Sequence, residues 1–262
     1  MRAFGFALAF SLWLSTQAQA APRRVVSLNL CTDELLLMLA APQQILSVTH
    51  LAQRRVETPL WRAGRRYKRN DGTLISVAPM RPDLVFTMGG GARDRLRISQ
   101  RLGIRTVDVP FPQNIADIEG SISTVARALG RPEAGNRLLM RIRQLKRSVP
   151  PTRLDTIWLG GGGRSVAAEG LAAQWMGLAG FRQRPLPGER ASLELLLVKP
   201  PTILLRSDYR SDQYSSAQRW LSHPLAGGTA RSRTIVTDGR RWTCMGPLMI
   251  AEVERLRSAG TR

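Results

Sequence analysis

Residues Thr73–Thr87 read TLISVAPMRPDLVFT, and residues Ser192–Arg206 read SLELLLVKPPTILLR. Each stretch begins with a hydroxyl residue suited to cap a helix, continues through a short apolar turn and reaches a proline, Pro82 or Pro201, that stops the helix. A run of apolar residues without alternation follows, which is typical of a strand buried on both faces of a parallel sheet. The repeated unit predicts two α/β lobes, with a ligand cleft between them.

The residues around the first copy alternate between strand and helix signals. We expect Thr32 to cap the first helix and residues 53–71 to form an irregular basic loop. This alternation predicts a parallel sheet with right-handed crossovers. The expected strands of this region are Arg24–Leu30, Ile45–Thr49, Leu84–Thr87 and Arg105–Val109.

The middle of the chain has a different pattern, because its apolar residues recur at helical spacing with almost no strand signal. Gly130-Arg131-Pro132 is either a kink in one helix or a junction between two helices. We therefore predict an α/β fold in which two Rossmann-like lobes with parallel sheets are joined by a long connecting helix. The expected divisions are a signal peptide over 1–20, an N-terminal α/β lobe over 21–113, a connecting helical segment over 114–149 and a C-terminal α/β lobe over 150–262.

The first twenty residues have the pattern of a cleaved secretion signal. Arg2 gives a positive start, Phe4–Leu14 is an apolar stretch too short to span a bilayer, and Ala18-Gln19-Ala20 is a cleavage site of the A-x-A type. No later segment is apolar for long enough to cross a membrane, so we do not expect membrane insertion. These features predict a protein exported to the periplasm of a Gram-negative cell.

The formal net charge is +20, and arginine supplies most of the basic residues. Such a charge is typical of nucleic-acid binders. The arginines are scattered along the chain, no recognition motif accompanies them, and export separates the protein from nucleic acid, so we expect no nucleic-acid partner. Two explanations of the charge stay open: a GC-rich genome that favours arginine codons, and attraction of an anionic ligand.

Taken together, six segments of the chain and the long mid-chain helical region resemble a known family. The sequence is similar to periplasmic substrate-binding proteins of ABC importers, of the cobalamin and iron-siderophore type. This resemblance implies a monomeric receptor that holds a corrinoid (vitamin B12) or ferric chelate between two lobes and delivers it to an inner-membrane ABC permease. The matching segments are RVVSLNLCTDELLLMLA from Arg24, ISVAPMRPDLVFT from Ile75, LAGF from Leu178, SLELLLVKPPTILL from Ser192, WLSHPL from Trp220 and RTIVTDGRRWTCMGP from Arg233.

One position departs from the pattern that the resemblance implies. Members of the family typically carry a surface glutamate at the start of the copied helix in each lobe, and the two carboxylates dock onto arginines of the permease. Glu194 occupies that position in the second copy, whereas Ile75 occupies it in the first. Half of the docking pair is therefore missing or is supplied by another residue.

Ligands of parallel α/β lobes lie beyond the carboxyl ends of the strands. Aromatic side chains in such loops suit a large planar ligand, and arginines suit anionic groups. We select as candidate ligand-binding residues Asn29, Cys31, His50, Trp61, Tyr67, Met88, Gly89, Arg164, Arg206, Tyr209 and Trp242.

Several kinds of site are not expected. His50 and His223 are the only histidines, too few for a protein metal site, and we expect no cofactor. There is no G-x-S-x-G motif and no grouping of nucleophile, base and orienting residue, so we expect no enzyme activity. Cys31 and Cys244 are the only cysteines, and in an oxidising compartment they either form a disulfide that bridges the lobes or remain two thiols near the ligand. The alternative functions are a haem receptor of the same fold and a periplasmic polyanion-binding or scaffolding protein.

Overall fold

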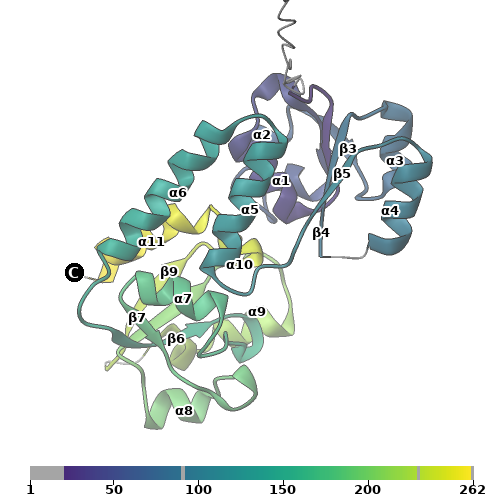
Figure 1. Ribbon diagram of the computed structural model, residues 1–262. Coiled ribbons are helices and arrows are strands. Elements are labelled where there is room, and N and C mark those ends of the chain that lie inside the picture. Colours follow the sequence, from purple (N-terminus) through teal and green to yellow (C-terminus); the bar gives the residue numbers. More distant parts are fainter. Residues whose placement is uncertain (1–20, 90–91, 229–230, 261–262) are drawn as a thin grey trace, which may run out of the picture.

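The structure is a computed structural model that describes residues 21–89, 92–228 and 231–260. The expected signal peptide lies outside these residues. In the described part, the chain forms a five-stranded sheet of order β3-β2-β1-β4-β5 and a four-stranded sheet of order β7-β6-β8-β9. All the strand pairings in both sheets are parallel. The prediction of two α/β lobes with parallel sheets is confirmed, and Figure 1 shows one lobe above the other.

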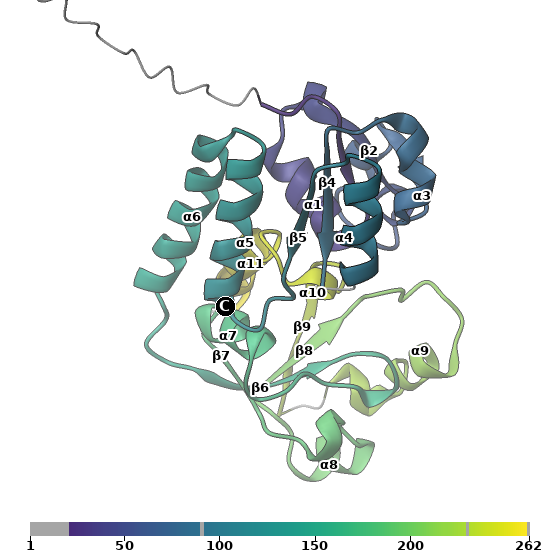
Figure 2. The same ribbon diagram turned by 45° about the vertical axis from the view of Figure 1, so that its right-hand side comes forward.

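The first lobe covers its sheet with helices on both faces. The helices α1 and α5 lie on one face of the sheet, and α3 and α4 cover the other face (Figure 2). Burial on both faces explains why β4 reads as an unbroken apolar run. The elements of this lobe are β1 (Val25–Ser27), α1 (Leu30–Leu39), β2 (Ile45–Thr49), α2 (Trp61–Gly64), β3 (Lys68–Asn70), α3 (Leu74–Val77), β4 (Leu84–Met88), α4 (Ala92–Arg101) and β5 (Thr106–Val109).

Two expectations for the first lobe are wrong. Residues 53–71 are not a loop throughout, because they contain α2 and the edge strand β3. Lys68 and Arg69 are exposed, so this strand has no apolar signature, and Asn70 anchors it by donating its side-chain amide to the carbonyl of Ser27 and the hydroxyl of Ser47.

The second wrong expectation concerns the residue that caps the first helix. The helix α1 is capped by Asn29, whose side-chain oxygen accepts a hydrogen bond from the backbone N–H of Cys31. Thr32 lies inside the helix, and its hydroxyl donates to the carbonyl of Asn29. An asparagine is at least as good an N-cap as a threonine, so the helix starts earlier and shortens the strand before it.

The segment between the lobes is two helices rather than one. The helices α5 (Ile115–Ala128) and α6 (Pro132–Arg147) lie side by side in Figures 1 and 2, joined by a turn in which Gly130 has a φ of 66°. A Cβ atom on Gly135 would lie 2.7 Å from the Cβ of Ala126, so glycine permits the close packing. Of the two alternatives at Gly130–Pro132, the structure has the junction, and α6 is the helix that runs on into the second lobe.

The second lobe repeats the architecture with a smaller sheet. The strand β8 pairs with β6 and β9, just as β4 pairs with β1 and β5, so the two copied units provide an interior strand of each sheet. The hydroxyls of Thr73 and Ser192 accept hydrogen bonds from the N–H groups of Ser76 and Leu195, which confirms both predicted helix caps. The elements are β6 (Leu154–Leu159), α7 (Leu171–Leu178), β7 (Phe181–Gln183), α8 (Leu193–Val198), β8 (Ile203–Ser207), α9 (Ser216–Leu221), β9 (Arg233–Thr237), α10 (Arg241–Cys244) and α11 (Met249–Gly260).

The largest buried cluster extends through both lobes. It includes Phe86 of β4, Ile122 of α5, Trp175 of α7, Leu205 of β8 and Met249 of α11, all with no exposed side-chain surface. The helix α11 packs against α6 and α7. Because apolar burial is the main favourable contribution to folding, a core shared in this way couples the stabilities of the two lobes.

Candidate ligand cleft

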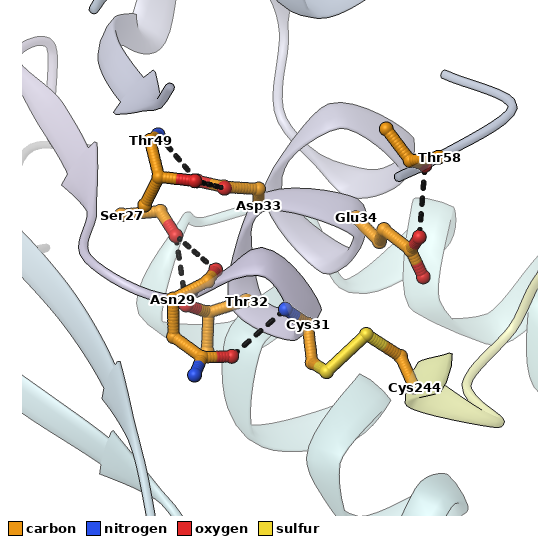
Figure 3. Close-up of a disulfide and its surroundings, with 9 residues drawn as sticks. All are labelled: Ser27, Asn29, Cys31, Thr32, Asp33, Glu34, Thr49, Thr58 and Cys244. Atoms are coloured by element: carbon orange, nitrogen blue, oxygen red, sulfur yellow. Dashed lines mark hydrogen bonds between the residues drawn. A yellow bond between two sulfur atoms is a disulfide. The ribbon is translucent and has the colours of Figure 1, made fainter. Parts of the chain in front are cut away.

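The carboxyl ends of β1 and β9 lead into a disulfide between the lobes. Cys31 lies in the first turn of α1, Cys244 ends α10, and the two residues are bonded with a Cα–Cα distance of 5.3 Å (Figure 3). Of the two alternatives for these cysteines, the structure has the disulfide. The cavity beside it is only about 10 Å³ and is lined by residues of both lobes, among them Leu35, Met88 and Pro247. We call this tightly packed region, centred on the disulfide, the cleft floor.

Trp242 contributes to this floor from inside the core. We expected it in a loop, but it lies in α10 and is buried. Its indole N–H donates to the hydroxyl of Thr237, and its ring centre is 5.9 Å from that of Trp158. Trp61 was also expected in a loop and instead begins α2, where the guanidinium groups of Arg62 and Arg65 lie 4.9 and 5.0 Å from its ring centre. Both short helices lack the length over which an apolar period can be recognised.

A second set of contacts joins the lobes at the rim of the cleft. The hydroxyl of Tyr209 donates to one carboxylate oxygen of Glu57 at 2.9 Å, and the guanidinium of Arg210 donates to the other at 2.7 Å. Nearby, the guanidinium of Arg240 donates to the carbonyl of Arg55 at 3.0 Å. Burial, followed by the hydrogen bond to Glu57, raises the pKa of Tyr209, so its hydroxyl remains a donor at neutral pH.

Arginines line the pockets at this rim. A pocket of about 220 Å³ lies between the lobes and is lined by Arg55, Val56, Asp208, Arg210, Ser211, Asp212 and Arg240. A pocket of about 330 Å³ shares Ser211 and Asp212 with it and extends under α9, where Arg206, Tyr214 and Arg219 line it. Within the described ranges, the side chains of Arg206 and Arg219 have no hydrogen bond or ion pair, which leaves two guanidinium groups available to an anion.

The other candidate residues are spread around the cleft. His50 lines a separate open pocket of about 450 Å³ with Asn70 and Asp71. Tyr67 packs against the core of the first lobe, and Arg164 is exposed beyond β6. Gly89 follows β4 at a φ of 85°, and a Cβ atom there would overlap the ring of Phe111. The structure thus brings Cys31 and Met88 together at the floor and Arg206 and Tyr209 at the rim.

Two acidic residues beside the floor are buried in α1. Asp33 accepts hydrogen bonds from the N–H and the hydroxyl of Thr49, and Glu34 accepts one from the hydroxyl of Thr58 (Figure 3). Burial raises the pKa of Asp33 to about 7 and that of Glu34 to about 8. Glu34 and Glu57 were not singled out in the sequence, because neither belongs to a motif and only the fold shows that they are buried.

The expected docking residues are accessible on the surface. Glu194 lies in the first turn of α8 and is exposed, and hydrogen bonds from its own backbone N–H and from Ser192 lower its pKa. Ile75 occupies the same place in α3, and 76% of its surface is exposed.

Within the described ranges, the chain has neither a membrane-spanning helix nor a cluster of metal-binding side chains. No helix there has the length and apolar character to span a membrane. No group of three or more His, Cys, Asp or Glu residues there is placed to hold a metal ion.

A family of known proteins matches part of the chain. The sequence model described as "Periplasmic binding protein" matches residues 25–150. This match, over just under half of the chain, is to the first lobe and the connecting helices. A search of curated proteins finds no significant relative.

Solved structures with this fold align along almost the whole chain. A vitamin B12 binding protein of Vibrio cholerae is 16% identical, with a TM-score of 0.62 and coverage of 91% of this chain and 96% of that one. A possible iron-binding protein of Staphylococcus epidermidis is 16% identical, with a TM-score of 0.66 and coverage of 91% and 98%. A haem-binding protein of Pseudomonas aeruginosa is 18% identical, with a TM-score of 0.63 and coverage of 91% and 92%. At these identities the likeness establishes the two-lobed fold.

Proposed function

We propose that this chain is a periplasmic receptor for an anionic ferric chelate, which it binds between its lobes and delivers to an ABC permease of the inner membrane. The observation that carries the proposal is the arginine-lined rim. There Arg206 and Arg219 have no partner among the described residues, and Arg55 and Arg210 line the pocket between the lobes. Guanidinium groups bind carboxylates and similar oxyanions in a bidentate manner. The net charge of +20 adds long-range attraction of an anion.

A corrinoid is the alternative ligand. The arrangement of the aromatic residues supports it less well than it supports an anionic chelate. We expected flat aromatic surfaces from Trp61, Tyr67, Tyr209 and Trp242. Trp242 is buried in the core, and the hydroxyl of Tyr209 is hydrogen-bonded to Glu57. Fewer rings are therefore available to stack on a planar ligand. Haem is planar and also carries carboxylates, so it belongs in the same comparison.

The test is a tryptophan-fluorescence titration at moderate salt with a ferric tris-catecholate, a neutral ferric hydroxamate, haem and cyanocobalamin. We expect saturable one-to-one quenching by the catecholate complex and an affinity lowered by roughly ten-fold or more in Arg206→Gln. Arg143→Gln is the matched control, because Arg143 is an exposed arginine of α6 far from the rim pockets. Tighter binding of cyanocobalamin would identify a corrinoid receptor, and a steep salt dependence without stoichiometry would identify a polyanion binder.

Export and docking complete the proposal. We infer cleavage after Ala20 and release into the periplasm, which N-terminal sequencing of the protein from the periplasmic fraction tests. We infer that Glu194 contacts the permease and that Ile75 makes an apolar contact in place of a second carboxylate. Stimulation of the ATPase activity of the reconstituted transporter should fall more in Glu194→Ala than in Ile75→Ala.

A further inference from the structure

The lobes are tied to each other at two separate places, and the two ties differ in kind. The disulfide at the floor is covalent. The contacts at the rim, between Glu57 and the pair Tyr209 and Arg210, are hydrogen bonds and an ion pair that water or a ligand can replace. We call these three residues the latch.

The partners of Glu57 come mainly from the other lobe. Its side chain is only 4% exposed, and Arg210 and Tyr209 of the second lobe use both carboxylate oxygens. Within its own lobe the nearest cation is Arg54, whose guanidinium is 3.8 Å away and more than half exposed. A buried carboxylate is stable only while it is paired, so closure of the lobes and pairing of Glu57 depend on each other.

The second lobe holds its part of the latch in a defined position. Arg210 has a φ of 54°, a conformation that residues other than glycine adopt only when their surroundings impose it. Its guanidinium lies 5.1 Å from the ring centre of Tyr209. A Cβ atom on Gly239 would lie 2.1 Å from the hydroxyl oxygen of Ser207 and 2.5 Å from the Cβ of Tyr209, so a glycine lets the turn after β9 pack directly against this loop.

The pocket between the lobes opens onto the latch. Arg210 lines this pocket of about 220 Å³ and is at the same time the ion-pair partner of Glu57. An anion that enters the pocket therefore competes with Glu57 for the same guanidinium. The disulfide stays intact while the anion replaces Glu57 at Arg210, because this replacement breaks no covalent bond.

We propose that the latch gates access to the cleft: an anionic ligand displaces Glu57 from Arg210, and the lobes then separate at the rim while Cys31–Cys244 keeps them joined at the floor. This inference rests on the proposed function for the identity of the ligand, but the latch itself is a property of the free protein. Opening is consequently one-sided, and the disulfide acts as its pivot.

Hydrogen–deuterium exchange of the ligand-free protein tests the latch. Glu57→Gln and Arg210→Gln should each raise the exchange rate of residues 54–60 and 208–212 together, by roughly ten-fold or more, because each removes a charge-assisted hydrogen bond. The double variant should exchange no faster than either single variant, because the residues act as one pair. Glu169→Gln, a change at an exposed glutamate outside the latch, should leave both segments unchanged.

The disulfide provides the second half of the test. In Cys31→Ser with Cys244→Ser, exchange should increase at the start of α1 and in α10, while the latch segments stay protected. The proposal is overturned if folded Glu57→Gln and Arg210→Gln proteins exchange like the wild type at 208–212, or if their effects simply add. The experiment uses no ligand, so a failure of every chelate to bind would overturn the proposed function and still leave the latch measurable.

Discussion

The two copies of the helix–proline–strand unit are alike as far as the end of the strand and differ immediately after it. In the first lobe, β4 ends in buried Met88 and continues to Gly89, which packs under Phe111. In the second lobe, β8 ends in Arg206 and Ser207, and the loop that follows carries Tyr209 and Arg210. The shared part forms an interior strand of each sheet. The next few residues determine whether the carboxyl end of that strand is apolar or polar.

This difference divides the cleft into two parts. The apolar end of β4 contributes to the cleft floor around the disulfide, where little space is left. The polar end of β8 contributes to the rim. The pockets lie there, together with the arginines that have no partner in the part of the chain that the structure describes. The repeated unit therefore forms an equivalent interior strand in each lobe, and the residues at and beyond the end of the strand determine the polarity of the cleft.

The largest expected effect tests whether the two strands share one core. Phe86→Ala in β4 should lower the free energy of unfolding by about 3–5 kcal/mol and Leu205→Ala in β8 by about 2–5 kcal/mol, because both side chains are fully buried. Urea denaturation followed by circular dichroism should show a single transition in both variants. Separate unfolding of one lobe would mean that the lobes are independent and that the common cluster adds little coupling.

The disulfide is the next test, because it joins the two lobes directly. Replacing Cys31 and Cys244 together by serine should lower the free energy of unfolding by about 2–4 kcal/mol, since the bond constrains an unfolded chain over a long loop. A reductant should produce the same loss in the wild type and none in the double variant. An unchanged stability after full reduction would show that packing alone holds the floor.

An effect that depends on pH distinguishes the first helices of the two lobes. The start of α1 buries Asp33 and Glu34, whereas α7 has no acidic residue in its first turn. Because the folded-state pKa values of about 7 and about 8 lie above the ordinary ones, this contribution to stability is complete below about pH 4 and is lost as the pH rises through 7 to 8.

Replacing Glu34 by glutamine should remove part of this pH dependence. The wild type should lose up to about 1.4 kcal/mol per pH unit for each such group between pH 5 and 8, and Glu34→Gln should show a flatter profile. Thermal unfolding over this pH range measures the difference. Parallel profiles for the two proteins would indicate that Glu34 is ionised and hydrated in the folded state.

The smallest effect compares the two helix caps. Thr73→Ala and Ser192→Ala should each cost about 1 kcal/mol, because each hydroxyl satisfies one N–H group at the start of a short exposed helix. Thr202→Ala, at an exposed threonine without such a role, should change the stability by less than about 0.5 kcal/mol. Clearly unequal losses from the two caps would show that the copies are not equivalent even in their shared part.

The sequence determined the two-lobed fold, the position of β4 and β8 and the caps at Thr73 and Ser192, because these depend on local chemistry: an apolar run, a proline and a hydroxyl at fixed spacing. It also predicted Arg206 and Tyr209 in a loop after a strand; the structure has Arg206 inside β8 and Tyr209 just beyond its end. Elements with too few apolar residues to show a period, such as β3 and α10, were missed.

Only the tertiary structure decided which residues from distant parts of the chain meet. It joined Cys31 to Cys244, buried Trp242 and set Glu57 against Tyr209 and Arg210. Burial and pairing are properties of two segments at once, and the sequence around Glu57 carries no signal of a partner about 150 residues away. The physical reason is that the role of a charged group depends on its burial and on its partners, and only the fold determines both.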